Sequence, residues 1–228
     1  MATDSTIAID GPGAVGKTTV GRLLAQRLGY LFIDTGNMYR AITWLSIEQA
    51  IDPGDEKELE RLASDIEIDF VRPAGTDTDA PERVTVDGRD LTEEIKRPEI
   101  DQQVSLVAKH PGVRKAMVSK QRSLVGRGGV VLAGRDIGTV VLPEARLKVY
   151  LTASVEERAS RRYLELRDLG YEEDYRTTLS KLRTRDKIDS ERRVSPLKPA
   201  EDARIVDTND LSPQQVVKRI LELWRLVN

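Results

Sequence analysis

A glycine-rich segment near the N-terminus combines the residue types that bind a nucleoside triphosphate. Residues 11–19 read GPGAVGKTT, and the glycines leave room for successive backbone N–H groups to converge on an anion. Lys17 can reach the outer phosphates, and the Thr18 hydroxyl can ligate Mg²⁺. The segment thus predicts a triphosphate site made of Gly11, Pro12, Gly13, Ala14, Val15, Gly16, Lys17, Thr18 and Thr19.

The pattern on either side of this segment is a strand before it and a helix after it. Ile7 and Ile9 alternate with smaller or polar residues, whereas residues 20–28 carry apolar side chains at helical spacing. A helix that begins at the loop directs the positive end of its dipole at the same anion. Both flanks therefore support a phosphate-binding loop.

Two further predicted strands end in polar clusters. Residues 30–34 predict a short buried strand, after which Thr35, Tyr39 and Arg40 follow. Residues 129–133 are nearly all apolar, as expected of a central parallel strand, and Arg135 and Asp136 follow them. Because ligands gather at the carboxyl ends of parallel strands, both clusters should face the phosphate loop.

The segment from residue 158 to residue 193 is rich in arginine and poor in lysine. Acidic residues are interleaved with part of it, which also fits a solvated helix face. Arginine binds phosphate oxygens bidentately through its planar fork and stays charged. We therefore expect several of these arginines to contact phosphate.

The remaining pattern predicts an insertion and further helices. Residues 66–70 and 84–86 alternate as small antiparallel strands, with either a decorative or a substrate-closing role. Pro98 and Pro111 each begin a helix, and these helices carry Ser105 and Arg114. Residues 147–151 and 203–207 predict two more strands, and residues 212–227 a closing amphipathic helix.

The composition limits the possible classes of protein. The 228 residues fit one domain, and the formal net charge of -2 argues against general binding to nucleic acid or membranes. The absence of cysteine excludes disulfides and thiolate catalysis, and His110 is expected in a surface connection. With neither a leader nor an apolar run long enough to span a bilayer, we expect a cytoplasmic protein, and we expect a monomer.

At this point four segments in order resemble the successive motifs of the bacterial-type cytidylate kinase family. They are GPGAVGKTT, DTGNMYR at residues 34–40, GRDIGTVV at 134–141 and RDKIDSERRVSPL at 185–197. The resemblance implies an α/β P-loop kinase fold: a five-stranded parallel sheet flanked by helices, an acceptor-binding insertion and a mobile lid. It implies a single domain, 1–228, with its core at 1–36, 99–153 and 195–228, the acceptor-binding region at 37–98 and the lid at 154–194.

The resemblance also implies the reaction and the residues that perform it. The enzyme would transfer a phosphoryl group from Mg-ATP to CMP, and to dCMP, with Thr18 at the Mg²⁺ ion. Lys17, Arg135, Arg185 and Arg192 would be catalytic, and Arg158 and Arg162 would join the phosphate loop in binding ATP. CMP would contact Thr35, Tyr39, Arg40, Ser105, Arg114, Arg135, Asp136, Asp189 and Arg192.

Two positions depart from the family pattern. Thr35 replaces a common serine, which keeps the hydroxyl and adds a methyl group to the pocket. Thr18 replaces a common glycine, which leaves open whether Thr18 or Thr19 ligates Mg²⁺.

Two rival functions also remain at this level, a kinase for another small molecule and a nucleotide-binding switch without enzymatic activity. The first would need different residues at Thr35, Ser105, Arg114 and Asp136.

Overall fold

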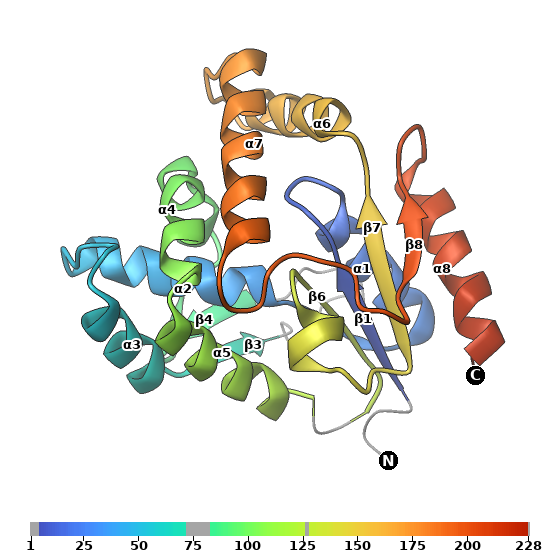
Figure 1. Ribbon diagram of the computed structural model, residues 1–228, viewed down its shortest axis with the longest axis horizontal. Helices are drawn as coiled ribbons and strands as arrows, with labels where there is room; N and C mark the ends of the chain where they lie inside the picture. Colours follow the sequence, from blue (N-terminus) through green and yellow to red (C-terminus); the bar gives the residue numbers. More distant parts are fainter. Residues whose placement is uncertain (1–4, 72–82, 126–127, 228) are drawn as a thin grey trace.

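The centre of the molecule is a five-stranded parallel sheet, as predicted. The computed structural model describes residues 5–71, 83–125 and 128–227. The strands are β1 (Thr6–Asp10), β2 (Leu31–Asp34), β6 (Val130–Gly134), β7 (Leu147–Thr152) and β8 (Arg204–Asp207), in the order β2-β6-β1-β7-β8 (Figure 1). β1 and β6 are buried along their whole length, as expected of strands covered on both faces. The phosphate loop therefore leaves the middle of the sheet.

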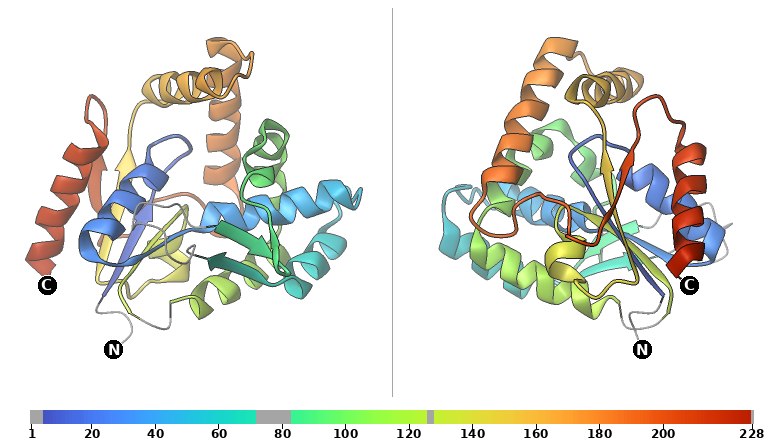
Figure 2. Two further views of the ribbon diagram at one scale, coloured as in Figure 1. Left: turned by 180° about the vertical axis from the view of Figure 1, so that it is seen from behind. Right: turned by 45° about the vertical axis from the view of Figure 1, so that its right-hand side comes forward.

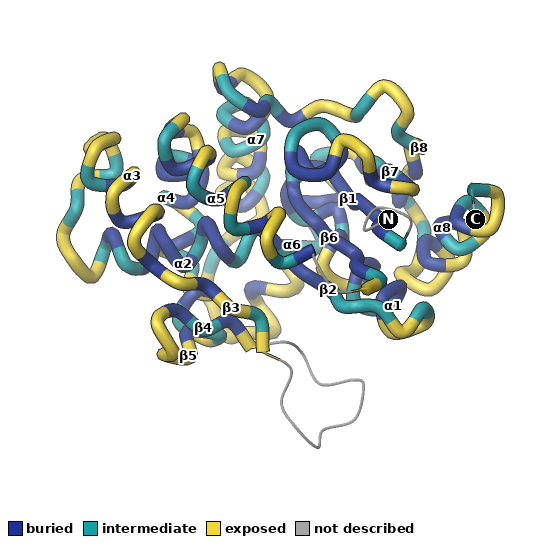
Figure 3. The backbone as a smooth tube through the Cα atoms, turned by 90° about the horizontal axis from the view of Figure 1, so that it is seen from below, coloured by how far each residue is buried: buried dark blue, intermediate teal, exposed yellow. Residues whose placement is uncertain are grey.

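Both faces of this sheet are covered. On one face Ile7 and Ile9 pack in the cluster of α1 (Lys17–Leu28) and α8 (Pro213–Val227). On the other face Ala8 packs with η2, a π-helical turn (Ile137–Val141). The alternation along β1 thus supplies two hydrophobic clusters, and Figure 3 shows the central strands as buried.

A second region beside the sheet has its own hydrophobic cluster. It contains α2 (Thr35–Glu48), α3 (Glu56–Asp65), η1 (Glu94–Lys96), α4 (Pro98–Ala108) and α5 (Pro111–Ser123). The predicted antiparallel insertion is confirmed as β3 (Ile68–Val71), β4 (Arg83–Val86) and β5 (Arg89–Asp90). Residues 72–82, between β3 and β4, lie outside the described residues.

Helices α6 (Val155–Asp168) and α7 (Tyr175–Glu191) stand above the carboxyl edge of the sheet (Figures 1 and 2). Ser154 caps α6 by accepting a hydrogen bond from the Glu157 backbone, and Asp174 caps α7 in the same way at Thr177. The arginine-rich segment thus lies over the strand ends that carry the polar clusters.

The prediction of a surface position for His110 is wrong. His110 is buried at the start of α5, and its Nε2 atom lies 2.7 Å from the carbonyl oxygen of Pro53. The ring therefore joins the α4–α5 connection to the loop before α3.

Along the described parts of the chain, no helix combines the length and apolar character that crossing a bilayer requires.

Candidate active site

The phosphate loop connects β1 to α1 through backbone conformations that only glycine adopts easily. Gly16 has φ 96°, and a Cβ atom on Gly11 would lie 2.4 Å from the carbonyl oxygen of Leu151. Lys17 Nζ donates to the carbonyl oxygens of Gly11 and Pro12, each at 2.7 Å. Burial, followed by the charge of Arg135, holds the pKa of Lys17 well below its usual range. A bound anion would relieve this concentration of positive charge.

The next strand end meets the loop through Asp34. Thr18 Oγ1 donates to Asp34 Oδ2 at 2.5 Å, and the other carboxylate oxygen accepts from the Gly36 backbone at the start of α2. The Thr35 hydroxyl donates to the Ala133 carbonyl oxygen of β6 at 2.9 Å. These contacts bring the ends of β2 and β6 to the phosphate loop, as the sequence predicts.

A cleft of ≈ 640 Å³ opens beside the loop. Lys17, Arg40, Arg135, Arg162 and Arg185 all line it, together with Thr18 and Thr19. A smaller cavity of ≈ 50 Å³ adjoins the cleft, and Arg135 and Arg185 line both spaces. The structure thus brings these five predicted cations, which are far apart in the sequence, to one place.

The smaller cavity is lined by the predicted CMP-binding residues, except Arg40, which lines the cleft. Its lining includes Thr35, Tyr39, Ser105, Arg114, Asp136, Asp189 and Arg192. Asp136 pairs with the buried guanidinium of Arg114, which also lies 5.2 Å from the centre of the Tyr39 ring. A second ion pair at 4.0 Å connects Asp136 to Arg192. A carboxylate and a cation are therefore adjacent in the wall of the cavity.

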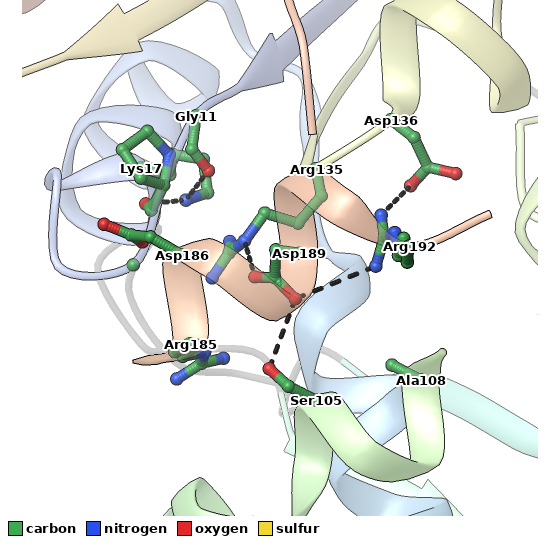
Figure 4. A network of polar contacts seen from close by, with 12 residues as sticks. Gly11, Lys17, Ser105, Ala108, Arg135, Asp136, Arg185, Asp186, Asp189 and Arg192 are labelled. Carbon is green, nitrogen blue, oxygen red and sulfur yellow. Dashed lines mark hydrogen bonds and ion pairs between the residues drawn. The ribbon is translucent and has the colours of Figure 1, made fainter. Parts of the chain in front are cut away.

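Asp189 of α7 lines the smaller cavity and lies beside Arg135, which lines both spaces (Figure 4). It accepts hydrogen bonds from Arg135 Nε at 3.0 Å and Ser105 Oγ at 3.2 Å, and Arg192 lies 3.9 Å away. Burial opposes its ionisation, but the surrounding arginines hold its pKa below the usual range. The carboxylate therefore holds Arg135 in place between the two spaces.

Several buried donors belong to residues that line the cleft or the smaller cavity. Among the described residues, Arg185 Nε, Arg192 Nη2, Arg114 Nε and the Tyr39 hydroxyl have no hydrogen-bond partner. Burial, followed by Arg135, lowers the pKa of Arg185 to about 10. Buried donors without partners are costly, so their concentration indicates a site for an anionic, hydrogen-bonding ligand.

The predicted ATP-binding arginines occupy different positions. Arg162 lines the cleft, whereas Arg158 is buried and donates to the Gly13 carbonyl oxygen at 3.1 Å and to Asp186 at 2.7 Å. Arg161 also lines the cleft and donates to Thr208 of the β8–α8 connection. Arg158 thus contacts the backbone of the phosphate loop, whereas Arg161, which was not among the predicted ATP-binding residues, lines the cleft.

Sequence reasoning also missed Asp10, the last residue of β1. Asp10 accepts hydrogen bonds from the backbone nitrogens of Ile137 and Gly138, each at 2.7 Å. Burial raises its pKa to about 6, against the opposing effect of these two bonds. An aspartate directly before the glycine loop was the available signal, but its partners are 127 and 128 residues away.

The oxygens near Lys17 fit a magnesium ion. Mg²⁺ prefers oxygen ligands and is usually held by one or two carboxylates, water and substrate phosphates. The Thr18 hydroxyl and the Asp34 carboxylate lie together beside the loop and supply such oxygens. In the described parts of the chain, no group of three or more histidine, aspartate or glutamate side chains could hold a metal ion.

The fold and the site together define a P-loop kinase. The five-stranded parallel sheet delivers the phosphate loop and two further strand ends to one edge, and the arginines of α6 and α7 cover that edge. The family model described as "Cytidylate kinase" matches residues 7–226. The chain therefore belongs to the cytidylate kinase family and is a phosphotransferase enzyme.

Curated relatives agree with this assignment, and a solved structure resembles the chain in fold. The chain is 50% identical over 219 residues to the cytidylate kinase of Bacillus velezensis, covering 96% of this chain and 95% of that protein. It is 48% identical over 217 residues to the cytidylate kinase of Bacillus subtilis, covering 95% of each. The structure of an uncharacterized protein from Eubacterium ventriosum has a TM-score of 0.50 at 11% identity, covering 97% of this chain and 98% of that one, which shows likeness of fold alone.

Proposed function

We propose that the enzyme transfers the γ-phosphoryl group of ATP to CMP, giving ADP and CDP. The observation that carries this proposal is the position of Arg135 and Arg185, which line both the cleft at the phosphate loop and the smaller cavity. ATP would occupy the cleft and CMP the cavity, so that the transferring group lies between these two cations. dCMP would use the same contacts, with Asp189 near the sugar.

The reaction needs charge and alignment more than acid–base chemistry. The attacking atom is a phosphate oxygen that is already anionic at neutral pH, so no general base is required. The protein must hold two mutually repelling anions in line and neutralise the charge on the transferring group. Lys17, Arg135 and Arg185 supply that charge, and Arg40 and Arg192 would hold the acceptor.

Magnesium and the lid complete the donor side of the proposal. Thr18, with Asp34 beside it, would hold a Mg²⁺ ion, and the ion would supply positive charge that neutralises part of the charge of the ATP phosphates. Residues 154–194 would act as a lid and residues 37–98 as the acceptor-binding region, around a core of 1–36, 99–153 and 195–228. Closure by the lid excludes water, which would otherwise hydrolyse ATP.

The choice of base is proposed to depend on the pair of Asp136 and Arg114. Cytosine presents an amino donor where uracil presents an oxygen acceptor, so a carboxylate favours the first and repels the second. Arg114 forms an ion pair with Asp136 and can donate to an acceptor atom on the same base edge. The cavity therefore offers an acceptor and a donor side by side.

We also propose a cytoplasmic monomer that binds no nucleic acid. The formal net charge of -2 supports the absence of nucleic-acid binding, because such binding relies on an excess of basic residues.

One assay tests the function. ADP release from Mg-ATP is measured with CMP, dCMP, UMP, AMP or no acceptor. We expect rapid release with CMP and dCMP, weak release with UMP and AMP, and very little without an acceptor. Preference for another acceptor would contradict the proposed base recognition, and release that is independent of any acceptor would contradict phosphoryl transfer to a nucleotide.

A further inference from the structure

Asp101 connects the acceptor side of the enzyme to the lid. It lies in the first turn of α4, where its side chain is 19% exposed. Its carboxylate forms ion pairs with Arg40 of α2, Arg162 of α6 and Arg185 of α7, the last at 3.2 Å. One carboxylate thus joins three arginines from three helices.

The two carboxylate oxygens divide these arginines between them. Oδ1 accepts from Arg40 and Arg185, and Oδ2 accepts from Arg162. Burial opposes ionisation of Asp101, but the guanidinium charges outweigh it and hold its pKa below the usual range. Asp101 therefore stays charged at neutral pH and offsets the mutual repulsion of the arginines.

The position of Asp101 in α4 does not by itself account for these contacts. Acidic residues are common in the first turn of a helix because they complement its dipole. Glu99 lies in the same turn and carries the same charge, but its side chain is exposed. The dipole explains the charge of both residues, whereas the three ion pairs of Asp101 require the arrangement of α2, α6 and α7 around it.

These ion pairs leave the arginines able to bind phosphate. Each guanidinium has five N–H donors, and the contacts with Asp101 use only a fraction of them. Arg185 Nε, for example, has no partner among the described residues. Asp101 also lines the cleft at the phosphate loop, so its charge lies where the phosphates of the substrates would bind.

We propose that Asp101 is a positioning residue that gathers Arg40, Arg162 and Arg185 and so draws the lid over the acceptor side before the substrates bind. The assignment of these arginines to phosphates rests on the function proposed above. Asp101 itself reduces the positive charge available to substrates, while it holds the arginines in the geometry that transfer requires. Its removal should therefore lower kcat without raising KM.

The lid position can be measured without any nucleotide. Because the chain has no cysteine, a single pair of introduced cysteines takes two spin labels specifically. Leu169→Cys, after the end of α6, and Glu48→Cys, at the end of α2, are exposed positions on the lid and on the acceptor side. Distances between the labels are compared in the parent, Asp101→Asn and Glu99→Gln forms.

We expect Asp101→Asn to shift the distances to longer values and Glu99→Gln to leave them as in the parent. An unchanged distribution in Asp101→Asn, or an equal shift in Glu99→Gln, would overturn the proposal. If the Asn form does not fold, as judged by its thermal melting, Asp101→Ser carries the same expectation. These outcomes do not depend on activity, so a parent enzyme without CMP kinase activity would refute only the proposed function.

Steady-state kinetics provides a second measurement on the folded variants. We expect kcat of Asp101→Asn to fall roughly ten- to hundred-fold, since small misplacements of catalytic groups cost that much. KM for CMP and ATP should stay the same or fall, because a negative charge has left the site. A rise in KM at unchanged kcat would overturn the positioning role.

Discussion

Asp10 Oδ1 accepts a hydrogen bond from the backbone nitrogen of Ile137 at 2.7 Å, which joins the end of β1 to the first residue of η2. Arg135 and Asp136 directly precede that residue. The bond therefore fixes the strand end that carries them relative to the phosphate loop. It is a long-range contact that a reader of the sequence would not expect from an aspartate at the end of a strand.

Asp10 should make the stability of the enzyme depend on pH. Burial raises its pKa to about 6 from the ordinary aspartate value of 3.8, so the folded protein binds this proton more tightly than the unfolded chain does. The resulting stabilisation is full below the unfolded pKa and is lost as the pH rises to the folded pKa. We expect the free energy of unfolding of the wild type, relative to Asp10→Asn, to fall by about 3 kcal/mol between about pH 3 and pH 7.

The measurement is urea unfolding of both proteins across this pH range. The difference between them isolates Asp10 from the other titrating groups. A difference that does not change with pH would contradict the prediction. We also expect kcat of Asp10→Asn to fall. An amide has one oxygen acceptor for the two backbone donors of Ile137 and Gly138, so the variant holds the strand end that carries Arg135 and Asp136 less firmly.

Lys17→Ala should abolish the binding of Mg-ATP. The ammonium group supplies the charge that faces the outer phosphates, and neither alanine nor the loop backbone replaces it. Calorimetric titration with Mg-ATP measures the loss. Arg27→Ala is the matched control, since Arg27 is an exposed cation in the last turn of the same helix, and it should bind Mg-ATP as the wild type does. Wild-type affinity in Lys17→Ala would refute the triphosphate site.

The sequence predicts the strand ends well because they depend on local pattern. Residues 129–133 are apolar throughout, and the strand found is Val130–Gly134, one residue later. Helix α3 was not predicted, since its short length presents only Leu59, Leu62 and Ala63 as buried residues. The segment after Asp136, IGTVV, carries β-branched residues but forms the π-helical turn that Asp10 caps.

For the site, too, the residues that a local sequence pattern marks could be predicted, and those whose role depends on distant residues could not. The glycines and Lys17 predict the phosphate loop by their types and spacing. Most of the residues that line the smaller cavity were predicted only from the resemblance to the cytidylate kinase family. Asp101 has no local signal, because its role depends on arginines that lie 61 and 84 residues away in the chain. His110 was misjudged for a related reason: its burial depends on the Pro53 carbonyl, 57 residues away.

Asp136→Asn should weaken the preference for CMP over UMP. The substitution removes the charge that repels the uracil oxygen but keeps a polar group beside Arg114. Alanine is avoided because it would leave the buried guanidinium of Arg114 without its side-chain partner. One such contact discriminates by roughly 1–3 kcal/mol, which corresponds to about a five- to 150-fold fall in the ratio of the two kcat/KM values. The ratio is measured on protein whose thermal melting confirms folding. An unchanged ratio would assign Asp136 another role.

Arg185→Gln should reduce turnover far more than nucleotide binding. Arg185 lines both cavities, and an arginine that contacts a transferring phosphoryl group contributes on the order of 10³ to 10⁵ in rate. Burial and neighbouring cations disfavour the positive charge of Arg185 in the free enzyme. Its interaction with the transferring phosphoryl group is therefore most favourable when negative charge develops there in the transition state. We expect kcat to fall by roughly 10³, with a much smaller change in the dissociation constant of ATP. Arg183→Gln, on the exposed face of the same helix, should retain wild-type kcat, and an equal loss in both variants would show that general positive charge, rather than the position of Arg185, drives the reaction.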